Sequence, residues 1–552
     1  MSLLPLASAL IVLGVPQNSA IQVNVDAKNG DTVSGTKVFR VTVDSSTAIQ
    51  QVEFYIGNTL ADTETSTPYM FTLDTIEDPD GDLKIRFKAY TAENKTAEKA
   101  LTLHVDNKRS AGAPFHIQAG LDALTDSKWQ KAIDEGRIAM KIDPQSTGAR
   151  IVLARANLGM NVLDKAQNYA EQATQQDPKN DTAYQLLAGI NIKRAFSTYA
   201  KEGADKSQVM SSISDSFKSA IDARNKSLDI EVDGAGAPSG DNLLRYVDVA
   251  LAASRFSLAI APLQDAIKSD PKNLKVVDRL AYAQLRSGRY NDALETLRYA
   301  KSQTNLDAYA DAVLAEVYWQ FNDTANATQA MVTANEEDPD DLGVRTAQAY
   351  IALKQNKTSV LAGLVKDLAR DQGQRADVNY FLMALSDRLQ QYNEARTYFQ
   401  TAVLAEPTMS DIYVEQANYS IDQSFQKDRK PEDKAQDYAE AKMFYQLAAQ
   451  ARPEAVDALA GIASVNMFLR NVQDAVRYAE AARDAAPDAA LGHYVCSGAY
   501  QLAGRLNEAQ TEMKRASQLD QGNLEGREIP SPTAVWKYLI AGGRVPVMSR
   551  PQ

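Results

Sequence analysis

The sequence predicts a mainly α-helical protein, an extended solenoid of about eleven helix-turn-helix repeats preceded by a small all-β domain. Two observations carry this prediction. The hydrophobic period is two residues before residue 107 and about 3.6 residues after residue 115. Prolines in the later part are separated by multiples of 34 residues. A chain of 552 residues is also too long for one ordinary core.

The composition restricts the partners that we expect. The chain has 71 acidic and 59 basic residues, a formal charge of -12 and no concentrated basic stretch, so nucleic acid is not an expected partner. The apolar content of 44% and the charged content of 24% are typical of a folded protein. The single cysteine, Cys496, excludes an intramolecular disulfide and a thiolate metal cluster.

Residues 1–20 contain the apolar run Leu3 to Val15, followed by the small residues Ser19 and Ala20. The run is too short to span a bilayer as a helix and is typical of an export signal. No Lys or Arg precedes it, so a retained apolar segment and a disordered leader stay open as alternatives. We therefore expect a secreted, cell-surface or periplasmic protein rather than a cytoplasmic one, and no other run is long enough to form a transmembrane segment.

Residues 21–107 alternate apolar and polar side chains in short runs, which predicts strands. Turn sequences such as Asn29-Gly30-Asp31 and Asp80-Gly81-Asp82 separate the runs. The runs are Ile21 to Val25, Val38 to Val43, Val52 to Ile56, Tyr69 to Leu73, Leu83 to Tyr90 and Ala100 to Val105. So many short strands in one small segment predict a β-sandwich.

The sequence of this segment resembles that of bacterial immunoglobulin-like domains. The resemblance is carried by VEFYIGNTLADTETSTPYMFTLDT, followed by IRFKAYTAENKTAEKALTLHVDN. The cysteine pair and core tryptophan of antibody domains are absent, so only the bacterial kind fits. The resemblance implies a spacer or adhesive module, usually outside the cytoplasm. The acidic residues Asp78 to Asp82 leave two interpretations open, a tight turn or a weak calcium site.

Residues 108–115 form a polar linker, and residues 116–523 form the repeat array. The stretch Leu274 to Asn305 is a typical unit, with a helical apolar pattern on each side of the break Ser287-Gly288-Arg289. Pro144 and Pro178 are 34 residues apart, and other prolines keep the same phase. Two intervals are too long, which predicts insertions near residues 229–240 and 423–434.

Small residues keep the phase of the prolines. Alanine lies twelve residues before each proline of the ladder, at Ala132, Ala166, Ala259, Ala327, Ala395, Ala441 and Ala475. Alanines there let neighbouring helices approach closely. This pattern resembles the tetratricopeptide repeat. The resemblance implies a superhelix of paired helices whose first helices line a concave, protein-binding surface.

No pattern points to catalysis. The three histidines, His104, His116 and His493, have no nearby Cys or carboxylate at metal-ligand spacing, and no phosphate-binding loop or nucleophile motif is present. His493 and Cys496 fall at packing positions of one helix, so we expect both to be buried structural residues. We therefore expect no enzyme activity, no cofactor and no metal.

Projecting the repeat phase onto the concave surface selects aromatic and arginine side chains, the usual anchors of protein interfaces. The alternative is that several of them pack between neighbouring repeats. The Lys and Asn pattern of family members that clamp a terminal carboxylate is missing. The candidate partner-binding residues are Tyr282, Arg286, Trp319, Tyr350, Tyr380, Arg388 and Tyr494.

The sequence thus predicts a non-enzymatic protein-protein interaction scaffold of the bacterial envelope or exterior, which docks a protein or peptide on its concave surface. The alternative is a structural subunit that assembles head-to-tail into an extracellular filament through residues 1–20 and the opposite end. At that end, residues 524–552 contain a predicted capping helix, Thr533 to Leu539, and the extended tail Arg544 to Gln552.

Overall fold

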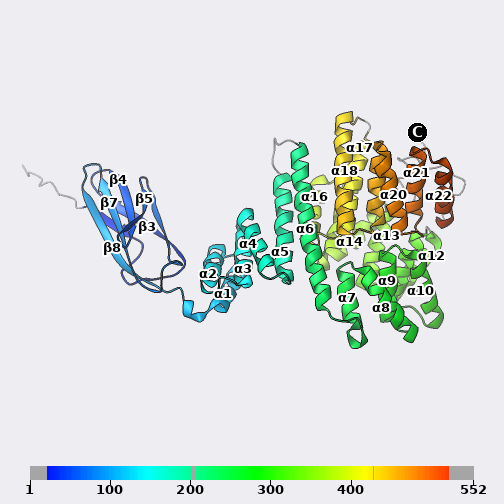
Figure 1. The fold of residues 1–552 in the computed structure, drawn as a ribbon, viewed down its shortest axis with the longest axis horizontal. Helices are drawn as coiled ribbons and strands as arrows, with labels where there is room; N and C mark the ends of the chain where they lie inside the picture. Colours follow the sequence, from blue (N-terminus) through cyan, green and yellow to red (C-terminus); the bar gives the residue numbers. More distant parts are fainter. Residues whose placement is uncertain (1–20, 200–205, 322, 427, 521–552) are drawn as a thin grey trace, which may run out of the picture. The chain divides into compact units, whose positions relative to one another are not determined.

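The computed structural model describes residues 21–199, 206–321, 323–426 and 428–520 (Figure 1). The chain divides into two compact units, one ending at Pro178 and the next beginning at Lys179. The predicted export segment at residues 1–20, the predicted capping helix and the tail after it lie outside the described residues. The segments on which the filament alternative rests are therefore not described either.

A β-sandwich opens the first unit. One sheet has the strand order β1-β3-β6, and the other has the order β2-β8-β7-β4-β5. Every described pair is antiparallel except β2 with β8. The strands are β1 (Gln22–Val25), β2 (Thr32–Val33), β3 (Thr36–Asp44), β4 (Ile49–Ile56), β5 (Thr59–Glu64), β6 (Tyr69–Asp74), β7 (Gly81–Thr91) and β8 (Thr96–Val105). The predicted small all-β domain is confirmed.

Four fully buried phenylalanines, Phe39, Phe54, Phe71 and Phe87, fill the space between the two sheets. The rings of Phe54 and Phe87 stack with their centroids 4.9 Å apart. Alternation along each strand places these rings on the inner face. They form the centre of a core that needs no disulfide, in agreement with the absence of a cysteine pair from this segment.

The acidic loop at residues 78–82 is held as a turn. Asp80 Oδ1 accepts a hydrogen bond from the backbone N–H of Asn107 at 3.0 Å. The Arg109 guanidinium donates to the carbonyl oxygen of Asp78 at 2.6 Å. No group of three or more potential ligands is arranged to hold a metal ion in the part of the chain that the structure describes. These contacts favour the turn over the calcium site.

Two helical pairs follow the sandwich in the first unit. The predicted linker is ordered and contains the 3-10 turn η1 (Arg109–Ala111) and the beginning of the first helix. The helices are α1 (Ala113–Thr125), α2 (Trp129–Ile142), α3 (Thr147–Gly159) and α4 (Leu163–Gln176).

Polar contacts join α2 to the sandwich, and we call this contact the junction. The Asp134 carboxylate accepts hydrogen bonds from Thr36 N at 3.0 Å and from Thr36 Oγ1 at 2.7 Å. Gly35 has φ +61°, and a Cβ there would lie 2.7 Å from Asp134 Oδ2, so this position requires glycine. Two ion pairs complete the junction, Arg137 with Asp74 at 2.6 Å and Lys141 with Glu77.

The second unit contains the remaining helices. Its long first pair is α5 (Asp181–Tyr199) and α6 (Lys206–Gly234), followed by the 3-10 turn η2 (Gly240–Asn242). The next helices are α7 (Leu243–Ala252), α8 (Phe256–Ser269), α9 (Leu274–Arg286), α10 (Tyr290–Gln303), α11 (Ala308–Gln320), α12 (Thr324–Glu337), α13 (Leu342–Lys354) and α14 (Thr358–Gln372). The last are α15 (Ala376–Arg388), α16 (Tyr392–Ala405), α17 (Ser410–Ser424), α18 (Pro431–Ala451), α19 (Val456–Phe468), α20 (Val472–Ala485), α21 (Ala490–Leu502) and α22 (Leu506–Leu519).

The 22 helices of the described residues make eleven pairs, which confirms the predicted number of repeats. The residues in excess of the 34-residue period mostly lengthen helices. Near the first predicted insertion, α6 has 29 residues and continues to Gly234. Near the second, α17 ends at Ser424 and the lengthened α18 begins at Pro431.

The turn inside a pair repeats one backbone conformation. Eight such turns contain a residue with φ between 55° and 74°, and only two of the eight residues are glycines. They are Ser127, Asn161, Ser254, Gly288, Asn356, Gln390, Arg470 and Gly504. The next N–H bonds back to the helix, as Arg289 N does to Gln284 O at 2.9 Å, which ends the first helix in a Schellman turn.

The predicted alanines lie where helices approach most closely. The seven alanines of the proline phase are each at most 4% exposed. Gly461 of α19 shows the same requirement, because a Cβ there would lie 2.3 Å from the Tyr445 ring of α18. Close packing between successive helices leaves little room for larger side chains at these positions, except at Ala395, which lines a hollow.

The helices of the second unit also make contacts between repeats that are far apart in sequence. Helix α6 packs on α18, and α5 packs on α16 (Figure 1). We call these contacts the closure. At its centre Phe217 of α6, 2% exposed, contacts the rings of Phe196, Phe399 and Tyr413 at centroid distances of 5.6 to 6.1 Å. The repeats of this unit therefore do more than contact their neighbours.

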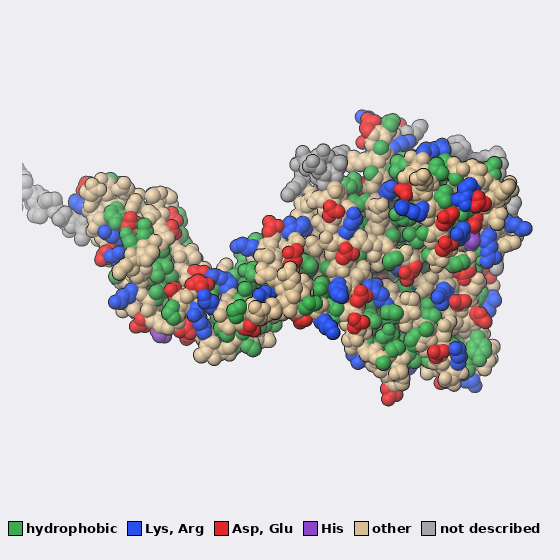
Figure 2. All heavy atoms as spheres, in the orientation of Figure 1, with side chains coloured by type: hydrophobic (Ala, Val, Ile, Leu, Met, Phe, Trp, Pro, Cys, Tyr) green, Lys and Arg blue, Asp and Glu red, His purple; other side chains and the backbone are tan. Residues whose placement is uncertain are grey.

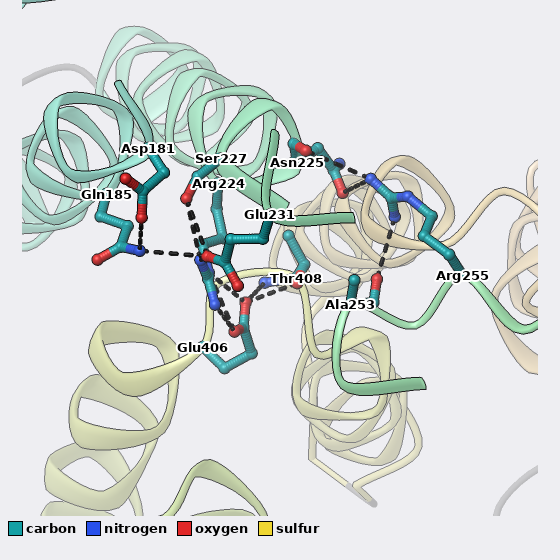
Figure 3. Close-up of polar contacts among 10 residues, drawn as sticks. All are labelled: Asp181, Gln185, Arg224, Asn225, Ser227, Glu231, Ala253, Arg255, Glu406 and Thr408. Atoms are coloured by element: carbon teal, nitrogen blue, oxygen red, sulfur yellow. Dashed lines mark hydrogen bonds and ion pairs between the residues drawn. The ribbon is translucent and has the colours of Figure 1, made fainter. Parts of the chain in front are cut away.

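A half-buried ion network supports the closure (Figure 3). Arg224 of α6 donates through Nη2 to Glu406 Oε2 at 3.0 Å, although 182 residues separate the two in sequence. Its Nη1 donates to Glu231 Oε1, also at 3.0 Å. Gln450 of α18 donates to Asp222 of α6 at 2.6 Å.

Candidate partner-binding site

The odd-numbered helices α9 to α21 contact one another in sequence, α9 with α11, α11 with α13 and so on, and form the inner layer of the second unit. The seven candidate residues all lie on this layer. Tyr282 and Arg286 are on α9, Trp319 on α11, Tyr350 on α13, Tyr380 and Arg388 on α15, and Tyr494 on α21.

Three of the candidates are fully covered by neighbouring helices. Trp319 and Tyr494 are each 1% exposed, and Tyr380 is 3% exposed. The hydroxyl of Tyr494 donates to Asp520 Oδ2 at 3.2 Å. In this conformation these three side chains therefore pack between neighbouring repeats, as the alternative interpretation holds.

Three other candidates lie together. The Arg286 guanidinium lies 5.1 Å from the Tyr282 ring centroid and 5.5 Å from the Tyr350 ring centroid, within the range of cation–π attraction. Arg286 Nη2 also donates to Glu316 Oε2 at 3.0 Å. The seventh candidate, Arg388, pairs with Glu415 at 2.5 Å on the same layer.

A small pocket opens beside Arg286, and we call it the inner pocket. It has a volume of about 70 Å³. Its lining residues come from α9, α10, α11, α13, α17, α19 and α21 and from the turns between α9 and α10, between α18 and α19 and between α20 and α21. Asn291 N donates to Asp488 Oδ2 at 2.8 Å and ties the start of α10 to that turn. The charged and aromatic lining residues are Arg286, Tyr290, Tyr350, Lys354, Asp411, Arg452, Glu454 and Asp457.

Sequence reasoning found Arg286 and Tyr350 of this pocket but missed Lys354, Asp411 and Arg452. Lys354 follows Tyr350 by four residues on α13, so it shares the face of that helix. Its Nζ lies 5.4 Å from the Tyr350 ring. This spacing could have identified Lys354 from the sequence. Arg452, in contrast, lies in a turn, and the repeat phase does not predict the position of that turn in space.

Charged side chains of the inner pocket stay ionised although they are buried. Burial raises the pKa of Asp411, but the nearby Arg452, Arg286 and Lys354 outweigh it, so the pKa lies below its usual value. Burial lowers the pKa of Lys354, but Tyr350 and other neighbours hold it well above the usual value. Groups of both signs therefore face the pocket at neutral pH, which suits a polar or charged group of a partner.

Two arginine nitrogens of the pocket residues are incompletely bonded. Arg286 Nε and Arg452 Nε are buried, and neither has a hydrogen-bond partner among the described residues. A buried donor without an acceptor is rare in folded proteins and costs free energy. An acceptor from a bound partner would satisfy such donors.

His493 and Cys496 are buried among the repeat helices. His493 contacts Glu512 Oε2 through Nδ1 at 2.5 Å and Pro487 O through Nε2 at 2.9 Å, so both ring nitrogens are engaged. Cys496 is fully buried, and burial raises the pKa of its thiol far above the usual value. A buried neutral thiol is a poor nucleophile.

Known proteins resemble parts of this chain. Residues 23–102 match the bacterial Ig domain family, and residues 123–190 match the tetratricopeptide repeat family. Both resemblances predicted from the sequence are confirmed. The TPR repeat-containing protein YpiA of Bacillus subtilis (strain 168) is 23% identical over 224 residues, which cover 40% of this chain and 51% of YpiA. The chain thus matches about half the length of that relative.

Two solved structures are similar at low identity. One is the APC/C hetero-tetramer Cut9-Hcn1, with 12% identity, a TM-score of 0.38 and coverage of 77% of this chain and 96% of that chain. The other is yeast Tom70, with 13% identity, a TM-score of 0.32 and coverage of 74% and 92%. Among the described helices, none combines the length and apolar character that crossing a bilayer requires.

Proposed function

We propose that this tetratricopeptide-repeat protein with an N-terminal bacterial immunoglobulin-like domain is a non-catalytic scaffold that docks a protein partner at its inner pocket, outside the cytoplasm. The repeat fold supports a role in protein-protein interaction. The surface supports it too, because both signs of charge are interspersed on the face shown in Figure 2 and no broad basic area marks a nucleic-acid site.

The observation that carries the proposal is the pair of incompletely bonded guanidinium groups at Arg286 and Arg452. Tyr282 and Tyr350 flank Arg286 and give a partner rigid aromatic contacts. A backbone carbonyl or a carboxylate of a partner, inserted into the pocket, would pair with the guanidinium groups of Arg286 and Arg452, which line it. The small volume suits one inserted side chain or a chain end, with further contacts on the surrounding surface.

A photo-crosslinking amino acid at Gln320, which lines the inner pocket, tests the proposal in cells that produce the protein. We expect a covalent partner band at this position and none with the same amino acid at Tyr299, which is 50% exposed on α10. Arg286→Gln should reduce the band about tenfold or more, as loss of an interface anchor does.

Arg279→Gln is the matched control for that substitution. Arg279 lies two turns earlier on α9, has a similarly buried side chain (27% exposed against 23% for Arg286) and is also ion-paired. Equal bands at Gln320 and Tyr299, or an equal loss with both arginine variants, would contradict docking at the inner pocket.

The location outside the cytoplasm is supported by the bacterial immunoglobulin-like domain and by the apolar run in residues 1–20. Mass spectrometry of the protein from its natural producer should show a mature N-terminus near Ile21. Native protein that begins at Met1 and fractionates with cytoplasmic enzymes would contradict the proposal.

A further inference from the structure

A second, larger hollow lies within the closure, and we call it the aromatic cavity. Its volume is about 180 Å³. It lies among α5, α6, α15, α16, α17 and α18, and it shares no lining residue with the inner pocket. Six aromatic side chains line it, Phe196, Phe217, Tyr392, Phe399, Tyr419 and Phe444.

The lining rings contact one another, and two of them are buried. Phe399 contacts the rings of Phe196 and Phe444 edge-on, at centroid distances of 5.7 and 5.8 Å. Phe399 and Phe444 are 6% and 3% exposed, whereas Tyr392 is 44% exposed. The Tyr392 ring centroid lies 5.6 Å from that of Tyr419, so an exposed tyrosine continues the aromatic lining toward solvent.

The cavity is large for a packing fault. Protein interiors are packed so closely that voids larger than a water molecule are few. An apolar cavity of about 150 Å³ is known to stay dry and to bind benzene. The aromatic cavity therefore has room for a compact apolar body of about the size of one benzene ring.

Two acidic side chains also line the cavity, Asp387 and Glu440. Asp387 Oδ2 is buried and has no hydrogen-bond partner among the residues that the structure describes. The adjacent cation Arg388 is already bound to Glu415 at 2.5 Å. The lining cation Arg396 is exposed to solvent and has an interaction partner of its own.

We propose that the aromatic cavity binds a small organic cation, an ammonium or amidinium group carried on a compact apolar body. The rings pack on the body and attract the positive charge through their faces. The carboxylate of Asp387, one of the lining residues, attracts the positive charge of the ligand.

The acid–base properties of the cavity agree with this ligand. Burial raises the pKa of Asp387 to about 7, with Glu415 acting in the same direction and Arg388 opposing. Burial also raises the pKa of Glu440. Burial is the largest cause of both shifts, and a bound cation would oppose it.

Calorimetric titration of the full-length protein at pH 8 with three probes of one shape tests the proposal. Benzylammonium carries a positive charge, benzyl alcohol carries none and benzoate carries a negative charge. We expect benzylammonium to bind at least tenfold more tightly than benzyl alcohol, and benzoate not to bind. Benzyl alcohol or benzoate binding as tightly as benzylammonium would overturn the proposal, as would no binding of benzylammonium at millimolar concentration.

Two variants place the binding in the cavity. Asp387→Asn should abolish the preference for benzylammonium over benzyl alcohol, whereas Asp367→Asn, on the exposed face of α14, should preserve it. Ala395→Met should fill the cavity and remove binding of both probes, with circular dichroism to verify folding. If Ala395→Met fails to fold, Asp387→Asn still decides, because an unchanged preference in that variant would overturn the site.

A fourth probe separates a free ligand from a side chain of a protein partner. The n-butylammonium ion has the shape of a lysine side chain and leaves part of the cavity unfilled. We expect it to bind at least tenfold more weakly than benzylammonium. Equal binding would overturn the assignment to a small molecule, because a lysine side chain would then fit equally well.

Discussion

The junction in the first unit and the closure in the second both join segments that are far apart in sequence, but they use opposite means. The junction consists of hydrogen bonds and ion pairs around Asp134, with partly exposed partners. The closure is a buried cluster of aromatic rings around Phe217 with an ion network at its edge. Apolar burial contributes more free energy than exposed charge pairs do, so the closure should be the stronger contact.

The largest expected effect comes from breaking the aromatic centre of the closure. Phe217→Ala should lower the free energy of unfolding of the second unit by about 3–5 kcal/mol, because it removes a buried ring and leaves a larger cavity. Urea unfolding followed by circular dichroism measures the loss. Val360→Ala, at a side chain that is 50% exposed, should have an effect of about 0.5 kcal/mol or less. Equal effects would mean that the closure does not stabilise the unit.

Removing the ion network should have a smaller effect. Arg224→Ala leaves Glu406 and Glu231, with side chains 24% and 35% exposed, without their cation. We expect a loss of about 2 kcal/mol, little changed by 0.5 M salt because the group is shielded from solvent. Lys268→Ala removes an ion pair whose cation is 73% exposed and should change stability very little. A strong salt dependence for Arg224→Ala would contradict this description.

A change of pH should affect the stability of the two regions in opposite directions. Burial, with the nearby Asp307, raises the pKa of Asp278 on α9 to about 7. The folded second unit therefore holds a proton that the unfolded chain has lost, and its stability decreases as pH rises from about 4 through 7. In the junction, Lys141 lowers the pKa of Glu77, so this contact persists as pH falls until Glu77 is protonated.

Melting temperatures between pH 5 and pH 8 test the contribution of Asp278. Asp278→Asn should remove part of the decrease with rising pH and gain on the order of 1 kcal/mol at pH 8. Asp265→Asn, at a side chain that is 79% exposed, should reproduce the wild-type profile. A second unit of the wild-type protein that becomes steadily more stable from pH 5 to pH 8 would show that the sign is wrong.

The smallest expected effect belongs to the junction. Asp134→Ala removes two hydrogen bonds to Thr36 and should cost about 1 kcal/mol of contact free energy. Faster proteolysis near residues 108–112, with the sandwich and the repeats still folded, would report the loss. Asp122→Ala on α1 serves as the control, because the Asp122 carboxylate is hydrogen-bonded to Gln118 of its own helix. Unchanged proteolysis in Asp134→Ala would mean that the junction is held by other contacts.

The difference between the two regions also explains what the sequence could predict. The alanines and prolines repeat every 34 residues because each repeat meets its neighbours in the same way, so periodicity reveals the fold. The closure breaks this rule. Phe217 lies in a lengthened helix outside the 34-residue phase, and its partners Phe399 and Tyr413 are almost 200 residues away. No local pattern encodes such a contact.

The same reasoning applies to the candidate binding residues. The repeat phase places Trp319 and Arg286 on the same layer of helices, but it does not give the depth of a side chain. The structure buries Trp319 and leaves Arg286 at a pocket, because the neighbouring helices cover one and not the other. Lys354 was within reach of sequence reasoning, whereas Arg452 depends on how a turn is placed.

Chemical cross-linking tests most directly whether the repeats of the second unit close on one another. Asp222→Cys and Gln450→Cys replace two side chains that are hydrogen-bonded at 2.6 Å across the closure. In a Cys496→Ala background, a short bis-maleimide should join them within one molecule in high yield. Asp222→Cys with Ala439→Cys, about three turns away along α18, should give little product. Cysteines that react singly in the first pair without joining, or equal yields for both pairs, would contradict the closure.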